Sequence, residues 1–129
     1  FRDFVITRIK RPVVLKGTPV APHEASDQDI QWTRIVELEL VHHPDQPRPE
    51  ISEMDYCMER GMLKMKLRAA MAGYILRKWS VDCSPMHKLN GPEHRLWLRN
   101  HLALYGVRSA VLAPGYESPE PVEPEQDCD

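Results

Sequence analysis

The stretch Val36-Glu37-Leu38-Glu39-Leu40 alternates apolar and acidic side chains without exception. Successive side chains of an extended chain point to opposite faces, so this pattern is typical of a strand with one buried face. A helix start at Ser26 predicts a short helical turn over residues 27–34, which leads into a strand over residues 35–42. Residues 43–49 contain three prolines. Proline cannot continue a ladder of hydrogen bonds, so the strand is expected to end there.

A second pattern covers residues 51–72, where apolar side chains recur every three or four positions. This spacing places them on one face of an amphipathic helix, so a long helix is predicted. Gly61 would lie inside that helix at a cost of about 1 kcal/mol relative to alanine. We interpret the methionine-rich face as core rather than as an adaptable binding groove. The apolar positions are Ile51, Met54, Met58, Met62, Met65, Ala69 and Ala72.

Shorter elements are predicted around these two segments. An alternating stretch over residues 4–9 predicts an opening strand, and residues 73–81 predict another. Apolar residues at helical spacing over residues 96–104 predict a second amphipathic helix. A short apolar stretch over residues 107–112 predicts a last strand.

The length of 129 residues and the hydrophobic content of 42% suit one domain with one core. The predicted elements give an α+β fold, a two-layer sandwich in which helices cover one face of a small, mostly antiparallel sheet. We expect this single domain to span residues 1–114. Residues 115–129 are rich in proline and acidic residues, so an irregular acidic C-terminal tail is expected there.

Charge is segregated along the chain, although the net charge is only −2. Residues 1–16 carry +4 and residues 60–116 carry +8, whereas residues 17–59 carry −8 and residues 117–129 carry −6. Two basic blocks can attract a polyanion even when the total charge is near zero. The alternative is that each block is a solvated surface with its own salt bridges.

The spacing of the reactive and metal-binding residues matches no catalytic centre, metal site or cofactor site. We therefore predict no enzyme activity, no metal and no cofactor. Cys57, Cys83 and Cys128 are odd in number and widely spaced, unlike a disulfide framework or a zinc ribbon. The six glycines never occur in the spacing of a phosphate-binding loop. No stretch approaches the roughly 20 apolar residues of a membrane span.

Histidines form the one cluster that could carry proton transfer. His42 and His43 lie beside Asp45 in one turn, and His87 follows later in the chain. Neighbouring residues of a strand point to opposite faces, which argues against a metal shared by His42 and His43.

Basic residues at the predicted opening strand and around Gly61 indicate contact with a phosphate backbone. If Gly61 allows the main chain to approach a polyanion, the cations around it would line that approach and fix position without reading sequence. The predicted RNA-binding residues are Arg8, Lys10, Arg11, Gly61, Lys64, Lys66 and Arg68.

Three short motifs resemble a known family. Ile6-Thr7-Arg8-Ile9-Lys10 resembles the opening strand of the universal large-subunit ribosomal protein thirty family, including its mitochondrial members. His43-Pro44-Asp45-Gln46-Pro47 is similar to that family's His-Pro-Asp-Thr-Pro turn, and Gly61-Met62-Leu63-Lys64 is similar to the start of its second helix. The resemblance implies a structural component of the large ribosomal subunit in the mitochondrial matrix. Its partners would be ribosomal RNA and, through the C-terminal extension, neighbouring ribosomal proteins.

Two alternatives stay open. His42-His43-Pro44-Asp45 is also similar to the His-His-Pro turn of pterin carbinolamine dehydratases, and Met86-His87 with Gly91 resembles that family's third-histidine segment. This resemblance implies that His42, His43 and His87 are acid–base residues around one pocket, in an active or a degenerate enzyme. The other alternative is an accessory subunit of another large complex.

Overall fold

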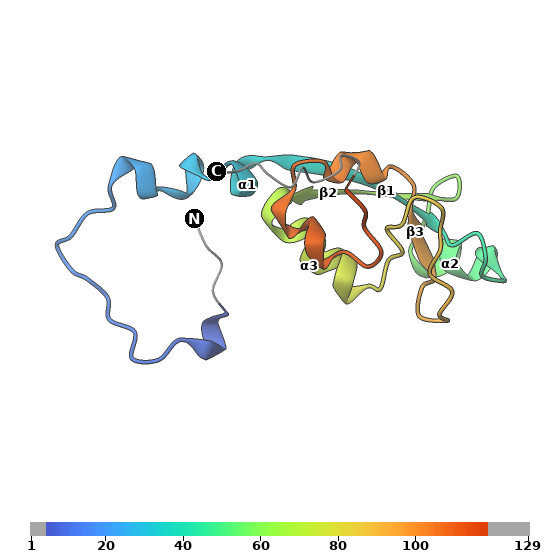
Figure 1. The fold of residues 1–129 in the computed structure, drawn as a ribbon, viewed down its shortest axis with the longest axis horizontal. Helices are drawn as coiled ribbons and strands as arrows, with labels where there is room; N and C mark the ends of the chain where they lie inside the picture. Colours follow the sequence, from blue (N-terminus) through green and yellow to red (C-terminus); the bar gives the residue numbers. More distant parts are fainter. Residues whose placement is uncertain (1–4, 119–129) are drawn as a thin grey trace, which may run out of the picture.

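A three-stranded antiparallel sheet organises the molecule, which we describe for residues 5–118 from a computed structural model (Figure 1). The strands are β1 (Ile35–His42), β2 (Met62–Arg68) and β3 (Leu96–Leu98), in the order β2-β1-β3. The α-helices are α1 (Ile30–Thr33), α2 (Pro49–Asp55) and α3 (Ala69–Lys78). The predicted α+β class with an antiparallel sheet is therefore confirmed, and so is the strand over residues 35–42. Short 3-10 helices connect these elements: η1 (Ile6–Arg8), η2 (Pro22–Glu24), η3 (Ser26–Gln28), η4 (His101–Leu104) and η5 (Arg108–Leu112).

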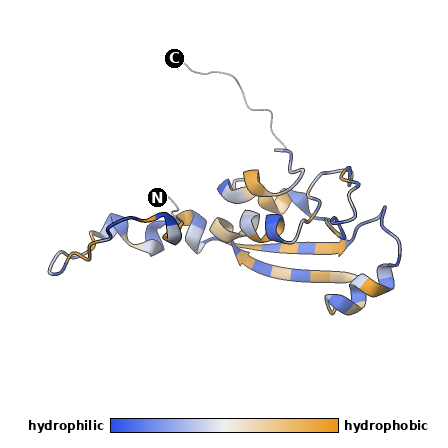
Figure 2. Cartoon of the chain, turned by 90° about the horizontal axis from the view of Figure 1, so that it is seen from below, coloured by the Kyte–Doolittle hydropathy of each residue, from blue (hydrophilic) through white to orange (hydrophobic). Residues whose placement is uncertain are grey.

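The register between β1 and β2 separates apolar from charged side chains. Val36, Leu38 and Leu40 stand opposite residues 67, 65 and 63, and this apolar face turns toward the core. Glu37 and Glu39 stand opposite lysines on the other face. Figure 2 shows the resulting alternation of hydrophobic and hydrophilic residues along both strands. The sheet thus has an inner apolar face and an outer charged face.

Helix α3 packs on the inner face of the sheet, and η5 packs on α3. Gly73 permits this close approach, because a Cβ there would clash with the carbonyl group of Ser109. The Ser109 hydroxyl accepts a hydrogen bond from the Gly73 N–H at 2.9 Å and donates one to the Ala69 carbonyl at 2.7 Å. The core side chains are Val36, Leu38, Leu40, Ala69, Ala72, Leu76, Val81, Cys83, Leu96, Leu98, Leu104, Val107, Ala110 and Ala113.

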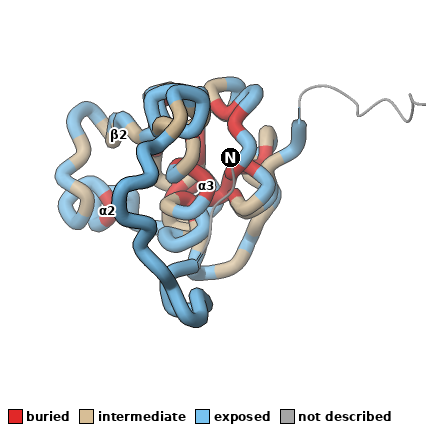
Figure 3. Tube along the Cα trace, turned by 90° about the vertical axis from the view of Figure 1, so that its left-hand side faces the viewer, coloured by how far each residue is buried: buried red, intermediate tan, exposed pale blue. Residues whose placement is uncertain are grey.

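The segment before α1 extends away from the sheet as an exposed arm (Figures 1 and 3). Its apolar side chains Val5, Ile6 and Val14 are between 54% and 82% exposed. The predicted strand over residues 4–9 is wrong, since η1 (Ile6–Arg8) occupies most of that stretch and Phe4 lies outside the described residues. A strand needs a partner for its backbone N–H and C=O groups, and among residues 5–118 no strand pairs with this segment.

The predicted helix over residues 51–72 is also wrong. The chain forms α2 up to Asp55, turns with Gly61 at φ +75°, and then runs as β2 before α3 begins at Ala69. The signal was ambiguous, because Leu63, Met65 and Leu67 alternate with basic residues at the period of a strand. Pairing with β1 decides between the two periods.

Three later predictions need the same correction. Residues 73–81 are mostly the helix α3 rather than a strand, since Ala69, Ala72 and Leu76 pack on the sheet at helical spacing. The predicted helix over residues 96–104 is instead β3 followed by η4. The predicted strand over residues 107–112 is the 3-10 helix η5.

The tail predicted over residues 115–129 falls mostly on residues 119–129, which lie outside the described residues. Its first residues contact the domain. Tyr116 packs against the core, and Glu117 lies 3.4 Å from the ammonium group of Lys88.

Candidate functional site

A buried polar network joins the end of β1 to the chain beside β3. The carboxylate of Asp82 is fully buried and accepts four hydrogen bonds. The Ser84 hydroxyl donates at 2.6 Å and the Ser84 N–H at 2.9 Å, while the Nε2 of His43 donates at 2.7 Å and the Leu89 N–H at 3.1 Å. The backbone of Asp82 also bridges β3, donating to the Leu96 carbonyl.

The surroundings fix the protonation of this network. Burial raises the pKa of Asp82, but the hydrogen bonds from Ser84, His43 and Leu89 outweigh it, so the pKa lies below its ordinary value near 3.8. The Asp45 N–H donates to the Nδ1 of His43, so the proton of the neutral ring is on Nε2. The side chains of His43 and Asp82 have no solvent exposure. The pair therefore fastens two chain segments together, and its polar atoms are satisfied within the protein.

A second network fastens α2 to the same end of the sheet. The ring of His42 contacts the Ser52 hydroxyl through Nδ1 at 2.8 Å and the Gln46 carbonyl through Nε2 at 2.7 Å. Arg95 donates to Ser52 and forms an ion pair with Asp55 at 3.0 Å. The imidazole of His42 is thereby committed to local contacts.

The three histidines do not converge on one pocket within residues 5–118. The rings of His43 and His87 lie 5.8 Å apart, but His43 is buried and His87 pairs with the half-exposed Asp45 at 3.1 Å. His42 lines a separate shallow cavity with α2 residues, and neither other histidine lines it. In this same range no three His, Cys, Asp or Glu side chains are grouped so as to hold a metal ion.

The outer face of the sheet carries charged side chains in two neighbouring rows. Its β1 and β2 part consists of Ile35, Glu37, Glu39 and Val41 of β1 and Met62, Lys64, Lys66 and Arg68 of β2, and we call this part the outer face below. Trp97 of β3 stands beside Val41 on the same side of the sheet. Glu37, Lys64 and Lys66 are exposed, and Glu39 is partly exposed. Within residues 5–118, none of these four side chains has an ion-pair partner within 4.0 Å. At one end, Arg68 stacks 4.3 Å from the ring of Trp32.

The structure separates the predicted RNA-binding residues into two groups. Arg8, Lys10 and Arg11 are exposed on the arm, whereas Lys64, Lys66 and Arg68 project from β2 beside the acidic residues of β1. Gly61 lies in the turn before β2 and not inside a helix. RNA contact by these seven residues stays a prediction.

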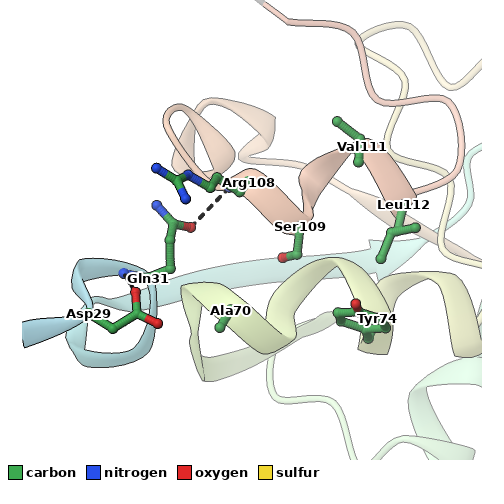
Figure 4. A pocket seen from close by; sticks show the side chains of 8 residues that line it. All are labelled: Asp29, Gln31, Ala70, Tyr74, Arg108, Ser109, Val111 and Leu112. Carbon is green, nitrogen blue, oxygen red and sulfur yellow. Dashed lines mark hydrogen bonds between the residues drawn. The ribbon is translucent and has the colours of Figure 1, made fainter. Parts of the chain in front are cut away.

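A groove of about 260 Å³ lies between α3 and η5 (Figure 4). Tyr74 and Ala70 of α3 form one wall, and Val111 and Leu112 form the other. Gln31 closes one end, where its side-chain carbonyl accepts from the Arg108 N–H at 2.9 Å. The sequence did not indicate this groove, because α3 was divided between a predicted helix and a predicted strand, and η5 was predicted as a strand.

Comparison with known families matches residues 35–104 to the family described as the BrxR transcriptional regulator, C-terminal dimerization domain. The match begins at the first residue of β1 and ends at the last residue of η4, so it contains the whole sheet. The chain belongs to the BrxR C-terminal dimerization domain family. Among curated proteins, no sequence matches it.

Membership of the BrxR family overturns both resemblances drawn from short motifs. The chain is neither a ribosomal protein of the large-subunit protein thirty family nor a pterin carbinolamine dehydratase, and ribosomal RNA and ribosomal proteins are not its expected partners. The motifs misled because each covers only four or five residues, and turns rich in His, Pro and Asp recur in unrelated folds. The structure also places Gly61-Met62-Leu63-Lys64 at the start of a strand and not of a helix.

The BrxR family consists of regulator domains, and this agrees with the prediction of a non-enzymatic role. No helix in the described part of the chain is long and apolar enough to cross a membrane. The mitochondrial location followed from the ribosomal resemblance alone and stays a prediction.

Proposed function

We propose that this chain holds two copies of a transcriptional regulator together, with the sheet and its helices acting as a homodimerization domain. The family match over residues 35–104 carries the proposal. The matched residues include most of the core, so the dimerizing unit is a folded body and not an isolated peptide.

Dimerization has a direct use in gene regulation. A regulator that pairs through a two-fold axis presents two DNA-contacting units at a fixed separation, and these units fit two half-sites of a symmetric operator. Once one unit has bound its half-site, the second unit meets the other half-site at high effective concentration. The dimer therefore binds DNA more tightly than a single unit, although each unit makes the same contacts. The role of this chain would be to set that separation.

The fold suits such a role. The buried network of Asp82, His43 and Ser84 and the packing of Gly73 on Ser109 hold the elements rigidly. A rigid body transmits a fixed geometry between the copies.

Sedimentation equilibrium or light scattering on the 129-residue chain tests the proposal. Between about 1 µM and about 100 µM, a range that covers ordinary and weak dimers, the mass should rise to twice the 14.9 kDa of one chain. A mass of one chain at every concentration would contradict the proposal.

A further inference from the structure

The outer face of the sheet is self-complementary in charge. Its β1 row carries Glu37 and Glu39, and its β2 row carries Lys66 and Lys64 directly opposite them. At one end, Val41 stands opposite Met62, so an apolar pair flanks the charged rows. Every β1 position in this part of the face therefore has a β2 neighbour with which it would interact favourably.

A two-fold axis converts this property into a complementary interface. Suppose that the axis lies midway between the two facing sheets, runs parallel to the strands and passes over the line between β1 and β2. The β1 row of one copy then faces the β2 row of the other. Glu37 then faces the partner copy's lysine at position 66, and Val41 faces its methionine at position 62. An axis perpendicular to the strands would instead place glutamate over glutamate, so charge selects the parallel axis.

We infer that a second copy of this chain packs face to face on the outer face, with the acidic row of each copy against the basic row of the other. The inference rests on the proposed dimerization and names the surface that performs it. Opposed sheets lie about 10 Å apart, a gap that Glu and Lys side chains can bridge from both sides. Arg99, whose N–H donates to the Glu39 carbonyl, follows β3 and lies outside the two rows that meet across the axis.

Two other occupants fit the described surface less well. A nucleic acid on this face would meet Glu37 and Glu39 as well as the lysines, and the glutamates would repel its phosphates. Edge-to-edge pairing of two β2 strands would bring lysines of both copies together along the new ladder, and like charges in opposed positions destabilise a sheet.

Matched charge reversals test the inference. The basic-face variant is Glu37→Lys with Glu39→Lys, and the acidic-face variant is Lys64→Glu with Lys66→Glu. Each variant replaces attraction by repulsion across the axis, so its homodimer should dissociate with a Kd at least about tenfold higher than that of the unmodified chain. Equal amounts of the two variants should form a mixed dimer.

The mixed dimer is the decisive observation. If these residues only paired within one chain, mixing the variants could not restore what each has lost. Under edge pairing, the basic-face variant would keep its β2 lysines and would dimerize like the unmodified chain. The control variant is Glu24→Lys with Asp27→Lys on the exposed arm, which makes the same change in charge outside the outer face and should leave the Kd unchanged.

Each outcome of the experiment has a defined meaning. An unmodified chain that stays monomeric would overturn the proposed function and this inference with it. An unmodified dimer whose Kd is unaffected by either reversal, or variants that form no mixed dimer, would overturn this inference alone. Circular dichroism verifies the fold of each variant. A further variant, Glu37→Gln with Glu39→Gln, removes charge without reversing it. It should raise the Kd by a smaller factor than the reversal does.

Discussion

Substitution of Asp82 by asparagine should destabilise the protein severely without changing the shape of the side chain. The carboxylate accepts two hydrogen bonds on each oxygen: from Ser84 on Oδ1, and from His43 and Leu89 on Oδ2. An amide has one acceptor oxygen and one NH₂ group, so two of these donors would lose their acceptor whichever way the amide is turned. A change of tautomer at His43 does not help, because its Nδ1–H would then face the Asp45 N–H.

The magnitude follows from these contacts. A buried donor left without an acceptor costs about 1–3 kcal/mol, and two donors are affected here. We therefore expect Asp82→Asn to lower the free energy of unfolding by about 2–6 kcal/mol, which is a large share of the roughly 5–15 kcal/mol of an ordinary domain.

Urea unfolding followed by circular dichroism measures this loss. The chain concentration must be fixed, because dimerization adds to apparent stability by mass action. Asp45→Asn is the matched control, since Asp45 is half-exposed and its bond to His87 is worth less than about 1 kcal/mol. A loss below about 1 kcal/mol for Asp82→Asn would refute the assignment of this network as a main fastening of the fold.

The same residue predicts a dependence on pH. Because the folded pKa of Asp82 lies below its ordinary value near 3.8, the ionised carboxylate contributes stability that is complete above that value. This contribution is lost as pH falls from near 3.8 through the folded pKa. Unfolding free energies measured from pH 5 to pH 2 should therefore fall more steeply for the unmodified chain than for Asp82→Asn, and parallel curves would contradict this.

Two further predictions concern close packing. Gly73→Ala should destabilise the chain by about 1–3 kcal/mol, although alanine favours helix, because the new methyl group meets the Ser109 carbonyl; thermal unfolding measures this, and an equal or higher Tm would contradict it. Burial raises the pKa of the Cys83 thiol, so iodoacetamide at pH 8 should modify the exposed Cys57 in the folded chain and Cys83 only after unfolding. Peptide mapping by mass spectrometry gives both rates, and equal rates would disprove the burial of Cys83.

Part of the fold was accessible from local patterns. The alternation of Val36, Leu38 and Leu40 with two glutamates identified β1, and the helical turn before it corresponds to η3 and α1. The period of a strand is unambiguous there, because the polar positions are acidic and the apolar ones are β-branched or leucine.

The candidate site was less accessible. His43 was noticed in the sequence, but its partner Asp82 is 39 positions away and carries no local signal. The outer face combines rows from two strands, and one of them, β2, was predicted as helix. Lysine, leucine and methionine all favour helix intrinsically, so β2 has a period of two but the composition of a helix.

The sequence by itself determined the class of the fold, the strand that organises it and the uneven distribution of charge. Only the tertiary structure decided that residues 62–68 pair with β1, because a neighbouring strand supplies the hydrogen bonds and the apolar contacts that override helix propensity. The same pairing sets Glu37 beside Lys66 and Glu39 beside Lys64. Two charge blocks that are distant along the chain thereby become one self-complementary surface, because register depends on which backbone groups meet and not on local composition.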